Sequence, residues 1–292
     1  TALDMDIRPY IRDPIAPIAD MGAEDGHSYI IAHPTQRLLP FPNPRGLMPR
    51  VMQATGCITE PLYRNTTSGK MAARRHVMGC LIVEISNDRF HVFEVQFADD
   101  GSFHALTGRE PRVYRADGTS DIVRAELVAE GDGHGGIGVW GDVDFRAAAD
   151  EVIQVVQPKR ITKEDLWDNA WGGHHQDKNL TQRLNRPAGA KTLADEAVST
   201  HHDLAWAKLI APEDCVVYVK GDANHNCHLK QRIDTGAWVT ESAENIRTII
   251  PLLGPYLLEG KDPVKMLVDP EGKLATWIYG ENSLVVDGID NS

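Results

Sequence analysis

Three short polar clusters in the carboxyl-terminal half of the chain hold the side-chain types that bind metal ions in proteins. Their carboxylate, imidazole and amide groups come, in chain order, from Asp132 and His134, from Asp165 and Asp168, and from Asn224 and His225. The last pair belongs to the stretch KGDANHNCH, which directly follows the apolar run CVVYV. A calcium loop, a hydrogen-bonded turn and part of a hydrolytic metal centre all use such residues.

The calcium loop can be rejected from the spacing. The residues DANHN match the start of an EF-hand loop, but Cys227 stands where the sharp turn needs Gly, and Ile233 stands where Glu must coordinate the ion. A turn stabilised by Asp or Asn side chains would account for Asp222 and Asn224 but not for His225. Taken alone, the Asp-x-His cluster among glycines is equally typical of a turn, and the Asp-x-x-Asp pair is typical of a helix start.

The elements that must position these clusters are strands separated by helices. Expected strands cover 125–130, the region near 160, 215–219, 265–269, 274–280 and 283–289, and expected helices cover 145–157, 192–210 and the stretch from 244 up to an interruption at Pro251. This order predicts an α/β layered architecture. Each cluster follows a strand, and sites in α/β sheets form beyond the carboxyl ends of strands. The three clusters are therefore expected to meet in space.

The rest of the chain divides by composition. Residues 1–45 are rich in Pro, lack a clear period and predict an irregular arm, whereas 46–123 read as mainly β. A hairpin is expected over 77–97, where two apolar runs flank Ser-Asn-Asp. The α/β region is expected over 124–292.

Charge and composition exclude some classes of function. The 292 residues carry a net charge of -12, of which residues 1–123 contribute -2 (13 basic, 15 acidic) and 124–292 contribute -10 (17 basic, 27 acidic). This argues against a broad basic surface for nucleic acid, although bound divalent ions can offset carboxylates locally in a nuclease. There is no apolar run long enough to span a membrane, and four widely spaced cysteines predict reduced thiols in a cytoplasm.

Taken in order, the three clusters resemble the calcineurin-like metallophosphoesterases, whose pattern is D-x-H, G-D-x-x-D and G-N-H-[DE], then a later His and a final H-x-H. The resemblance implies a layered β-sandwich flanked by helices and two divalent ions, of Mn, Mg, Fe or Zn, that clamp a phosphate and activate water. It also implies roles for the matching residues. Asp132 and His134 correspond to ligands of the first metal, Asp165 to the bridging carboxylate, Asn224 to a ligand of the second metal, His225 to the catalytic phosphate-binding histidine and Asp168 to the second acid of the middle motif.

A narrower resemblance rests on longer segments. HPTQRLLPFPN (33–43), the stretch 48–85, DDGSFHAL (99–106) and EDLWDNAWGGHHQDKNLTQR (164–183) resemble bacteriophage metallophosphoesterases, a group that includes an early DNA-degrading protein. The likeness spans roughly 33–292 and places His174 and His175 near the site. It implies a nuclease that acts on DNA in the cytoplasm of the infected bacterial host.

The chain departs from the family pattern at three places. Glu164 precedes Asp165 where the family has Gly or His, Asn226 replaces the acid of the third motif, and no histidine follows His228. Without the later histidines, we expect a truncated chain, a second chain that carries the missing motifs, or lost catalysis. Two hypotheses follow: a metal-dependent phosphodiesterase or nuclease, complete or completed by a second chain, and a catalytically impaired phage protein that uses the scaffold to bind a host protein.

Overall fold

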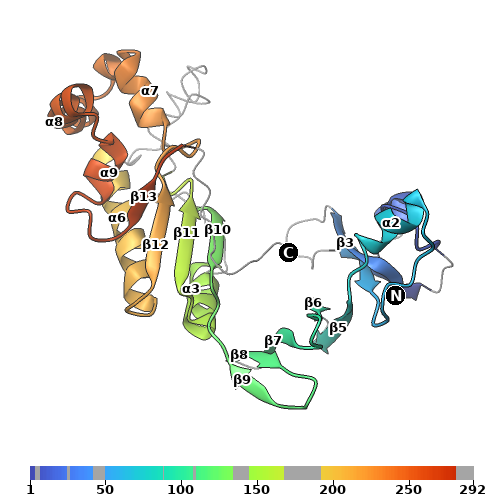
Figure 1. Cartoon of the computed structure of the whole chain (residues 1–292). Coiled ribbons are helices and arrows are strands. Elements are labelled where there is room, and N and C mark those ends of the chain that lie inside the picture. Colours follow the sequence, from blue (N-terminus) through green and yellow to red (C-terminus); the bar gives the residue numbers. More distant parts are fainter. Residues whose placement is uncertain are drawn as a thin grey trace. The chain divides into compact units, whose positions relative to one another are not determined.

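The chain is mixed α/β and divides into two compact units. The computed structural model describes residues 1–3, 7–24, 27–41, 50–87, 89–107, 110–133, 145–167 and 192–280 (Figure 1). The units are Thr1–Val123 and Arg124–Ser292, so the division falls where the sequence analysis places the start of the α/β region.

The first unit begins with a four-stranded sheet in the order β1-β2-β4-β3. The strands are β1 (Ala2–Leu3), β2 (Tyr29–Ile31), β3 (His33–Phe41) and β4 (Arg50–Gly56), and only β3 runs antiparallel to its neighbour. Helices η1 (Ala16–Ile18) and α1 (Ala19–Glu24) precede β2. The prediction of an irregular arm over 1–45 is therefore wrong for the described part. Strands β1 and β2 are too short to show a period, β3 contains two prolines, and a core around Ile15, Ile31 and Met52 stabilises the sheet by tertiary packing.

The remainder of the first unit consists mainly of antiparallel strands. The expected hairpin is present as β5 (Gly79–Ser86) and β6 (Arg89–Gln96), paired from Gly79↔Gln96 to Ser86↔Arg89. A three-stranded sheet follows, formed by β7 (Phe103–Thr107), β8 (Glu110–Tyr114) and β9 (Ser120–Ile122). Helix α2 (Thr67–Ala73) begins after Thr66, whose hydroxyl accepts from the Gly69 amide at 3.1 Å. This unit carries none of the predicted site residues.

The second unit contains a four-stranded sheet in the order β10-β11-β12-β13, and every neighbouring pair is parallel. The strands are β10 (Val128–Asp132), β11 (Arg160–Glu164), β12 (Val216–Lys220) and β13 (Thr276–Ile278). Because all four run the same way, their carboxyl ends lie along one edge of the sheet. That edge is where all three polar clusters of the sequence begin.

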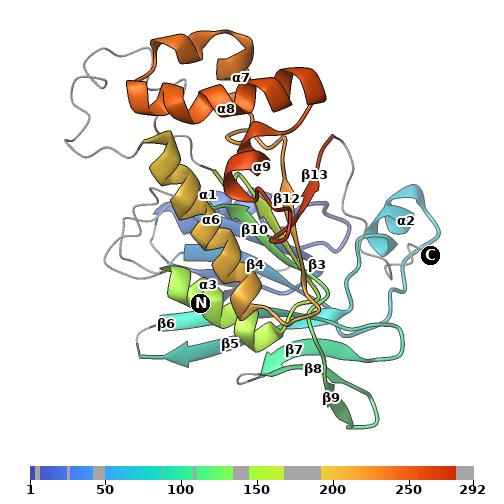
Figure 2. The ribbon, with the colours of Figure 1, turned by 90° about the vertical axis from the view of Figure 1, so that its left-hand side faces the viewer.

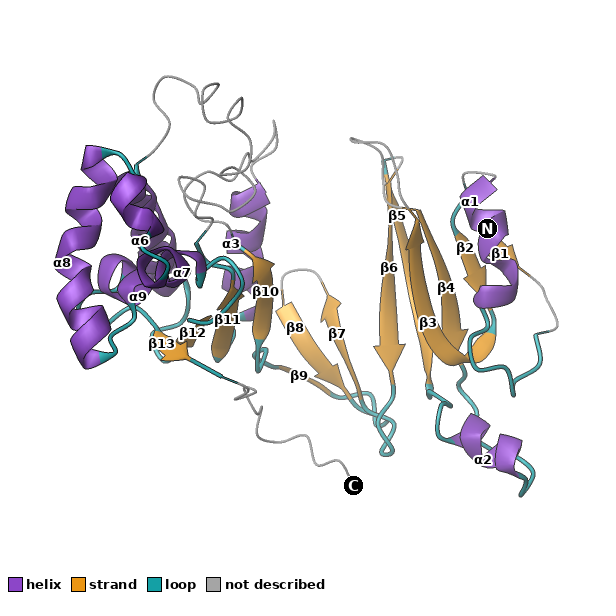
Figure 3. Ribbon diagram, turned by 90° about the horizontal axis from the view of Figure 1, so that it is seen from above, coloured by secondary structure: helices purple, strands orange, loops and turns teal. Residues whose placement is uncertain are grey.

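Helices connect and cover these parallel strands. They are α3 (Phe145–Val156), α6 (Leu193–Ile210), α7 (His228–Asp234), η2 (Ala237–Thr240), α8 (Ala243–Glu259) and α9 (Pro263–Val268). In Figure 2, α3 and α6 lie across the sheet, and in Figure 3 the helices α6 to α9 gather beside β12 and β13. The buried side chains of Leu204, Val217, Leu229, Ile249 and Val268 join α6 to α9 with β12 in one core, whereas Ile153 of α3 packs with Ile161 and Cys215 in a second, smaller one.

Two predictions in this unit are wrong. Helix α8 continues through Pro251 and Pro255 to Glu259 instead of stopping at Pro251. Proline removes a backbone donor and strains a helix, but the buried face of α8, with Ile249 and Leu252, outweighs that cost. The expected strand 265–269 is instead part of α9, whose start is capped by Asp262 and whose first residue is Pro263.

Candidate functional site

The carboxyl edge of the parallel sheet brings the predicted clusters together at the level of the backbone. Strand β10 ends at Asp132, which is paired with Glu164 of β11, and the Gly133 amide donates to the Glu164 carbonyl at 3.5 Å. Strand β11 then leads directly into Asp165. The first and second clusters thus leave the sheet side by side, as the strand-end argument predicts.

Asp165 is held in an unusual conformation where β11 ends. Its φ is +33°, in the left-handed region that non-glycine residues rarely adopt, although Asp tolerates it better than most. The residue is 9% exposed, and its Oδ1 accepts a hydrogen bond of 2.8 Å from the backbone amide of His225. This contact joins the second cluster to the third across the ends of β11 and β12. Oδ2 takes no part in that bond.

Asn224 and His225 lie in the tight turns that follow β12. Asn224 is exposed, and His225 is partly exposed, with its ring 5.1 Å from the ring of His228. The turn is fixed by the amide of His225 on Asp165 and by the carboxylate of Asp222, whose Oδ2 accepts from the Gly280 amide at 2.6 Å. This is not the local side-chain contact of an Asp-stabilised turn, because Gly280 lies 58 residues along the chain; the bond instead ties the segment after β13 to the turn.

Asn226, at the position where the metallophosphoesterase pattern has an acid, has a structural role that the sequence did not reveal. It is fully buried, its Oδ1 accepts from the Trp167 amide at 3.1 Å, and its Nδ2 donates to the Lys220 carbonyl at 2.8 Å. Both atoms of the amide are therefore used to join the end of β11 to the end of β12. A carboxylate has no hydrogen to give to the Lys220 carbonyl, so the amide is better suited to this position.

A second polar cluster beside the turn was also missed. Lys230 Nζ donates to the Gly221 carbonyl at 3.2 Å, forms an ion pair with Asp262 at 2.8 Å and lies 5.1 Å from the centre of the Tyr279 ring. Burial, followed by the charge of Asp262 and a hydrogen bond to it, raises the pKa of Tyr279 above its usual value. No local sequence pattern indicates this cluster, because its members come from α7, from the start of α9 and from the end of β13.

The neighbouring cysteine is not a candidate nucleophile. Burial raises the pKa of the Cys227 thiol, the charge of Lys230 lowers it, and the carboxylates of Asp222, Asp262 and Asp165 raise it again. A raised pKa keeps the thiol protonated at neutral pH, and a thiol is a much weaker nucleophile and metal ligand than a thiolate. The carboxylates around it show that the turn lies in an acidic environment.

The other predicted site residues are not among the described side chains. His134, Asp168, His174 and His175 lie outside the described residues, and Asp132 is described only as part of the β10 backbone. Among the described side chains, no group of three or more His, Cys, Asp or Glu residues is arranged to hold a metal ion. The second cluster and the third are thus joined, and the first is represented by its backbone alone.

The donors that are described fit a divalent ion by type. Asp165 offers a carboxylate oxygen not used by the His225 amide, Asn224 an exposed amide and His225 an imidazole. Oxygen and nitrogen ligands of this kind suit Mn, Mg, Fe and Zn. Three side chains form only part of the set that a site with two ions needs.

Comparison with known protein families, curated proteins and solved structures found no match to this chain. Across the described residues, no helix combines the length and the apolar character needed to cross a bilayer.

Proposed function

We propose that the chain is a metal-dependent phosphodiesterase, of the nuclease type, whose site lies at the carboxyl edge of β10 to β12. The contact between Asp165 and the His225 amide carries this proposal, because it joins two of the three clusters that follow strands. The left-handed backbone of Asp165 adds support. Strained conformations cost about 1–3 kcal/mol and gather at functional sites, where the surrounding structure maintains them.

Each predicted site residue has a role in this proposal. Asp165 and Asn224 would hold divalent ions together with Asp132 and His134, and Asp168, His174 and His175 would complete the surroundings. Bound ions of this class polarise a phosphoryl oxygen and lower the pKa of a coordinated water. His225 would contact the phosphate and supply a proton to the leaving oxygen. The hydrogen bond from the His225 amide to Asp165 holds the backbone of His225 at the same edge as Asp165.

The proposed substrate is DNA in the cytoplasm of an infected bacterium, and the proposed fold is the layered metallophosphoesterase sandwich. The resemblance to phage proteins motivates both, and a second chain that carries the later histidines would complete the site. The acidic composition of 124–292 is compatible with this substrate, since bound cations reverse the local charge where phosphate must lie.

Metal binding by wild type and by Asp165→Asn tests the proposal. Asn keeps an oxygen acceptor for the His225 amide and tolerates the left-handed backbone, so the fold should persist while the charge is lost. Calorimetric titration with Mn²⁺ should show uptake by wild type and a loss of affinity of about tenfold or more in the variant. The matched control is Asp117→Asn, the same change at an exposed turn of the first unit, which should bind as wild type does.

Hydrolysis of DNA is measured next, with and without a candidate second chain. His225→Ala should still take up Mn²⁺ through Asp165 and Asn224 but hydrolyse DNA about 10²- to 10⁴-fold more slowly, the usual contribution of a positioned acid. If wild type takes up no metal under either condition, the proposal is refuted. The alternative, an impaired scaffold that binds a host protein, would then be favoured.

A further inference from the structure

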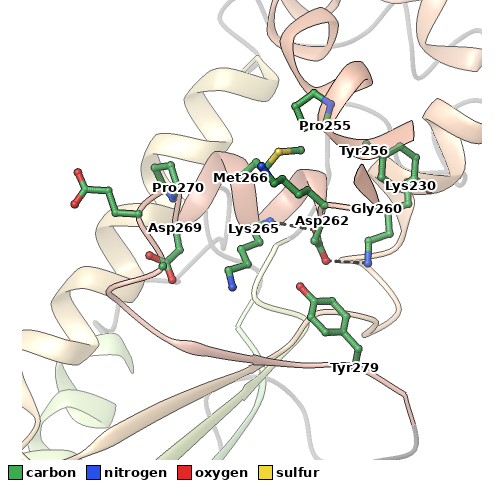
Figure 4. A pocket seen from close by; sticks show the side chains of 13 residues that line it. Lys230, Pro255, Tyr256, Gly260, Asp262, Lys265, Met266, Asp269, Pro270 and Tyr279 are labelled. Atoms are coloured by element: carbon green, nitrogen blue, oxygen red, sulfur yellow. Dashed lines mark hydrogen bonds and ion pairs between the residues drawn. The ribbon is translucent and has the colours of Figure 1, made fainter. Parts of the chain in front are cut away.

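A pocket of about 870 Å³ lies beside the turn that follows β12 (Figure 4). Its size falls within the range of sites for small organic ligands. The walls come from α7, the end of α8, α9, the turn at 270–272 and the residue after β13. All of these belong to the second unit.

The pocket and the candidate site share a wall. Lys230, which lines the pocket, donates to the carbonyl of Gly221, where the turn bearing Asn224 and His225 begins. Tyr279 also lines the pocket, and its ring packs so closely on Gly221 that a Cβ there would lie 2.2 Å from Cε1. A ligand in the pocket would therefore lie next to the turn of the third cluster.

The charges around the pocket leave a cation available. The Asp262 carboxylate accepts from the amides of Val264 and Lys265 at 2.8 and 3.2 Å and also pairs with Lys230. The Asp269 carboxylate accepts from three backbone amides and from the Trp277 indole. Both carboxylates are therefore already engaged by groups of the chain itself.

Lys261 and Lys265, which also line the pocket, differ in whether a carboxylate pairs with them. Lys261 is paired with Glu259 at 2.7 Å, whereas the ammonium group of Lys265 has no ion-pair partner within the described part of the chain. In Figure 4 the Lys265 side chain extends toward the space that Tyr279 borders. The pocket thus presents a free positive charge and favours an anionic group.

The remaining surface of the pocket is apolar or aromatic. Pro255, Met266, Pro270 and Tyr279 line it, and the hydrogen bond from Tyr279 to Asp262 holds the ring in place. Flat apolar surfaces of this kind suit a planar ring. A small inorganic anion would leave them unused, and an uncharged apolar ligand would leave Lys265 unused. A nucleotide carries both a planar base and a phosphate.

We propose that this pocket binds one nucleotide of a single DNA strand, with the phosphate on Lys265 and the base against Met266 and Tyr279. The inference rests on the proposed function, because it identifies the nucleotide as part of the substrate that lies beside the hydrolytic site. Stacking on such a surface tolerates any base, so the pocket would hold the strand without reading its sequence.

Binding is tested without metal, so that hydrolysis plays no part. Fluorescence anisotropy compares a short labelled oligothymidylate with an abasic strand of the same length, in the presence of a chelator and at low salt. Wild type should bind the oligothymidylate about tenfold more tightly than the abasic strand, the typical effect of one stacked base. Lys265→Met should weaken binding of both strands by about five- to tenfold.

The matched control is Lys159→Met, which removes the same charge from a lysine of the second unit that is paired with Glu126 and does not line the pocket. It should bind both strands as wild type does, and circular dichroism checks that both variants are folded. Equal losses in the two lysine variants would show a non-specific effect of charge and overturn the inference. Equal binding of the abasic and base-bearing strands, or no binding at all by wild type, would overturn it as well.

The two proposals fail in different ways. Normal metal-free binding with no metal uptake would refute the hydrolytic function and leave the nucleotide pocket standing. Hydrolysis by Lys265→Met with an unchanged KM would refute the pocket and leave the hydrolytic function standing.

Discussion

Replacing Asn226 by Asp would introduce the acid that the metallophosphoesterase pattern has at this position, and we expect it to destabilise the second unit. The Asn226 amide is fully buried between the Trp167 amide and the Lys220 carbonyl. Asp keeps the acceptor for Trp167 but loses the donor to Lys220. It also places a carboxylate oxygen about where Nδ2 lies, 2.8 Å from the Lys220 carbonyl oxygen.

The expected cost combines a lost hydrogen bond with a buried charge. Leaving a buried group unsatisfied costs about 1–3 kcal/mol, and a buried unpaired charge costs more, so we expect a loss on the order of 3 kcal/mol near neutral pH. At 1.36 kcal/mol per pKa unit, this loss corresponds to raising the pKa of the new carboxyl by about two units above 3.9, to about 6.

The sign of the pH dependence follows from that shift. A carboxyl whose folded pKa is raised holds its proton more tightly in the folded state, so the folded state gains stability as the pH falls. The protonated acid also regains an O–H group that can donate to the Lys220 carbonyl. The destabilisation should therefore be complete above about pH 6 and should shrink toward about pH 4.

Urea unfolding, monitored by tryptophan fluorescence, measures this loss of stability in the second unit. All six tryptophans, from Trp140 to Trp277, lie in the second unit, so their emission reports on it alone. The matched control, Asn224→Asp, makes the same chemical change two residues earlier at an exposed side chain and should alter stability by less than about 0.5 kcal/mol. A variant at Asn226 as stable as wild type at about pH 7, or a loss independent of pH, would refute the reasoning.

Three further changes test other contacts of the second unit, each by the same urea unfolding. The Arg124 guanidinium lowers the pKa of the Asp214 carboxyl, so Asp214→Asn should be less stable than wild type at neutral pH, with a difference that vanishes as the pH falls below 3.8. Gly221→Ala places a Cβ 2.2 Å from the Tyr279 ring and should cost about 1–3 kcal/mol through overpacking. Thr192→Ala removes the side-chain cap of α6 and should cost about 1 kcal/mol.

Each of these has a result that would contradict it. For Asp214→Asn, it is a stability difference from wild type that does not change on acidification. For Gly221→Ala, the control is Gly254→Ala in α8, where a Cβ meets nothing within 4 Å, and equal effects of the two would argue against a clash. For Thr192→Ala, unchanged stability would show that α6 depends on packing alone.

Local patterns in the sequence determined several elements correctly. The two apolar runs on either side of Ser-Asn-Asp predicted the hairpin of β5 and β6, and helical spacing predicted α3 and α6 to within a residue or two. The start of α6 at Leu193 follows from Thr192, which forms a capping box with Asp195. These features depend on interactions between residues close together in the chain, so the sequence alone is enough to predict them.

The placement of polar clusters at strand ends was predictable for the same reason. Apolar runs followed by polar turns located Asp165, Asn224 and His225, and parallel strands have their carboxyl ends at one edge. To predict that these residues converge, only the direction of the strands was needed. The contact of the Asp165 carboxylate with the backbone of His225, and the left-handed backbone that accompanies it, depended on how β11 and β12 pair.

Only the tertiary structure decided which distant groups satisfy one another. It buried Asn226 between two strands, continued α8 through two prolines, and gathered Lys230, Asp262 and Tyr279 beside the turn. A helix, strand or turn is selected by the periods and caps of neighbouring residues, whereas a buried polar group takes whichever partner the neighbouring elements bring within hydrogen-bond distance. That partner depends on the whole arrangement, and a single sequence does not contain it in any local pattern.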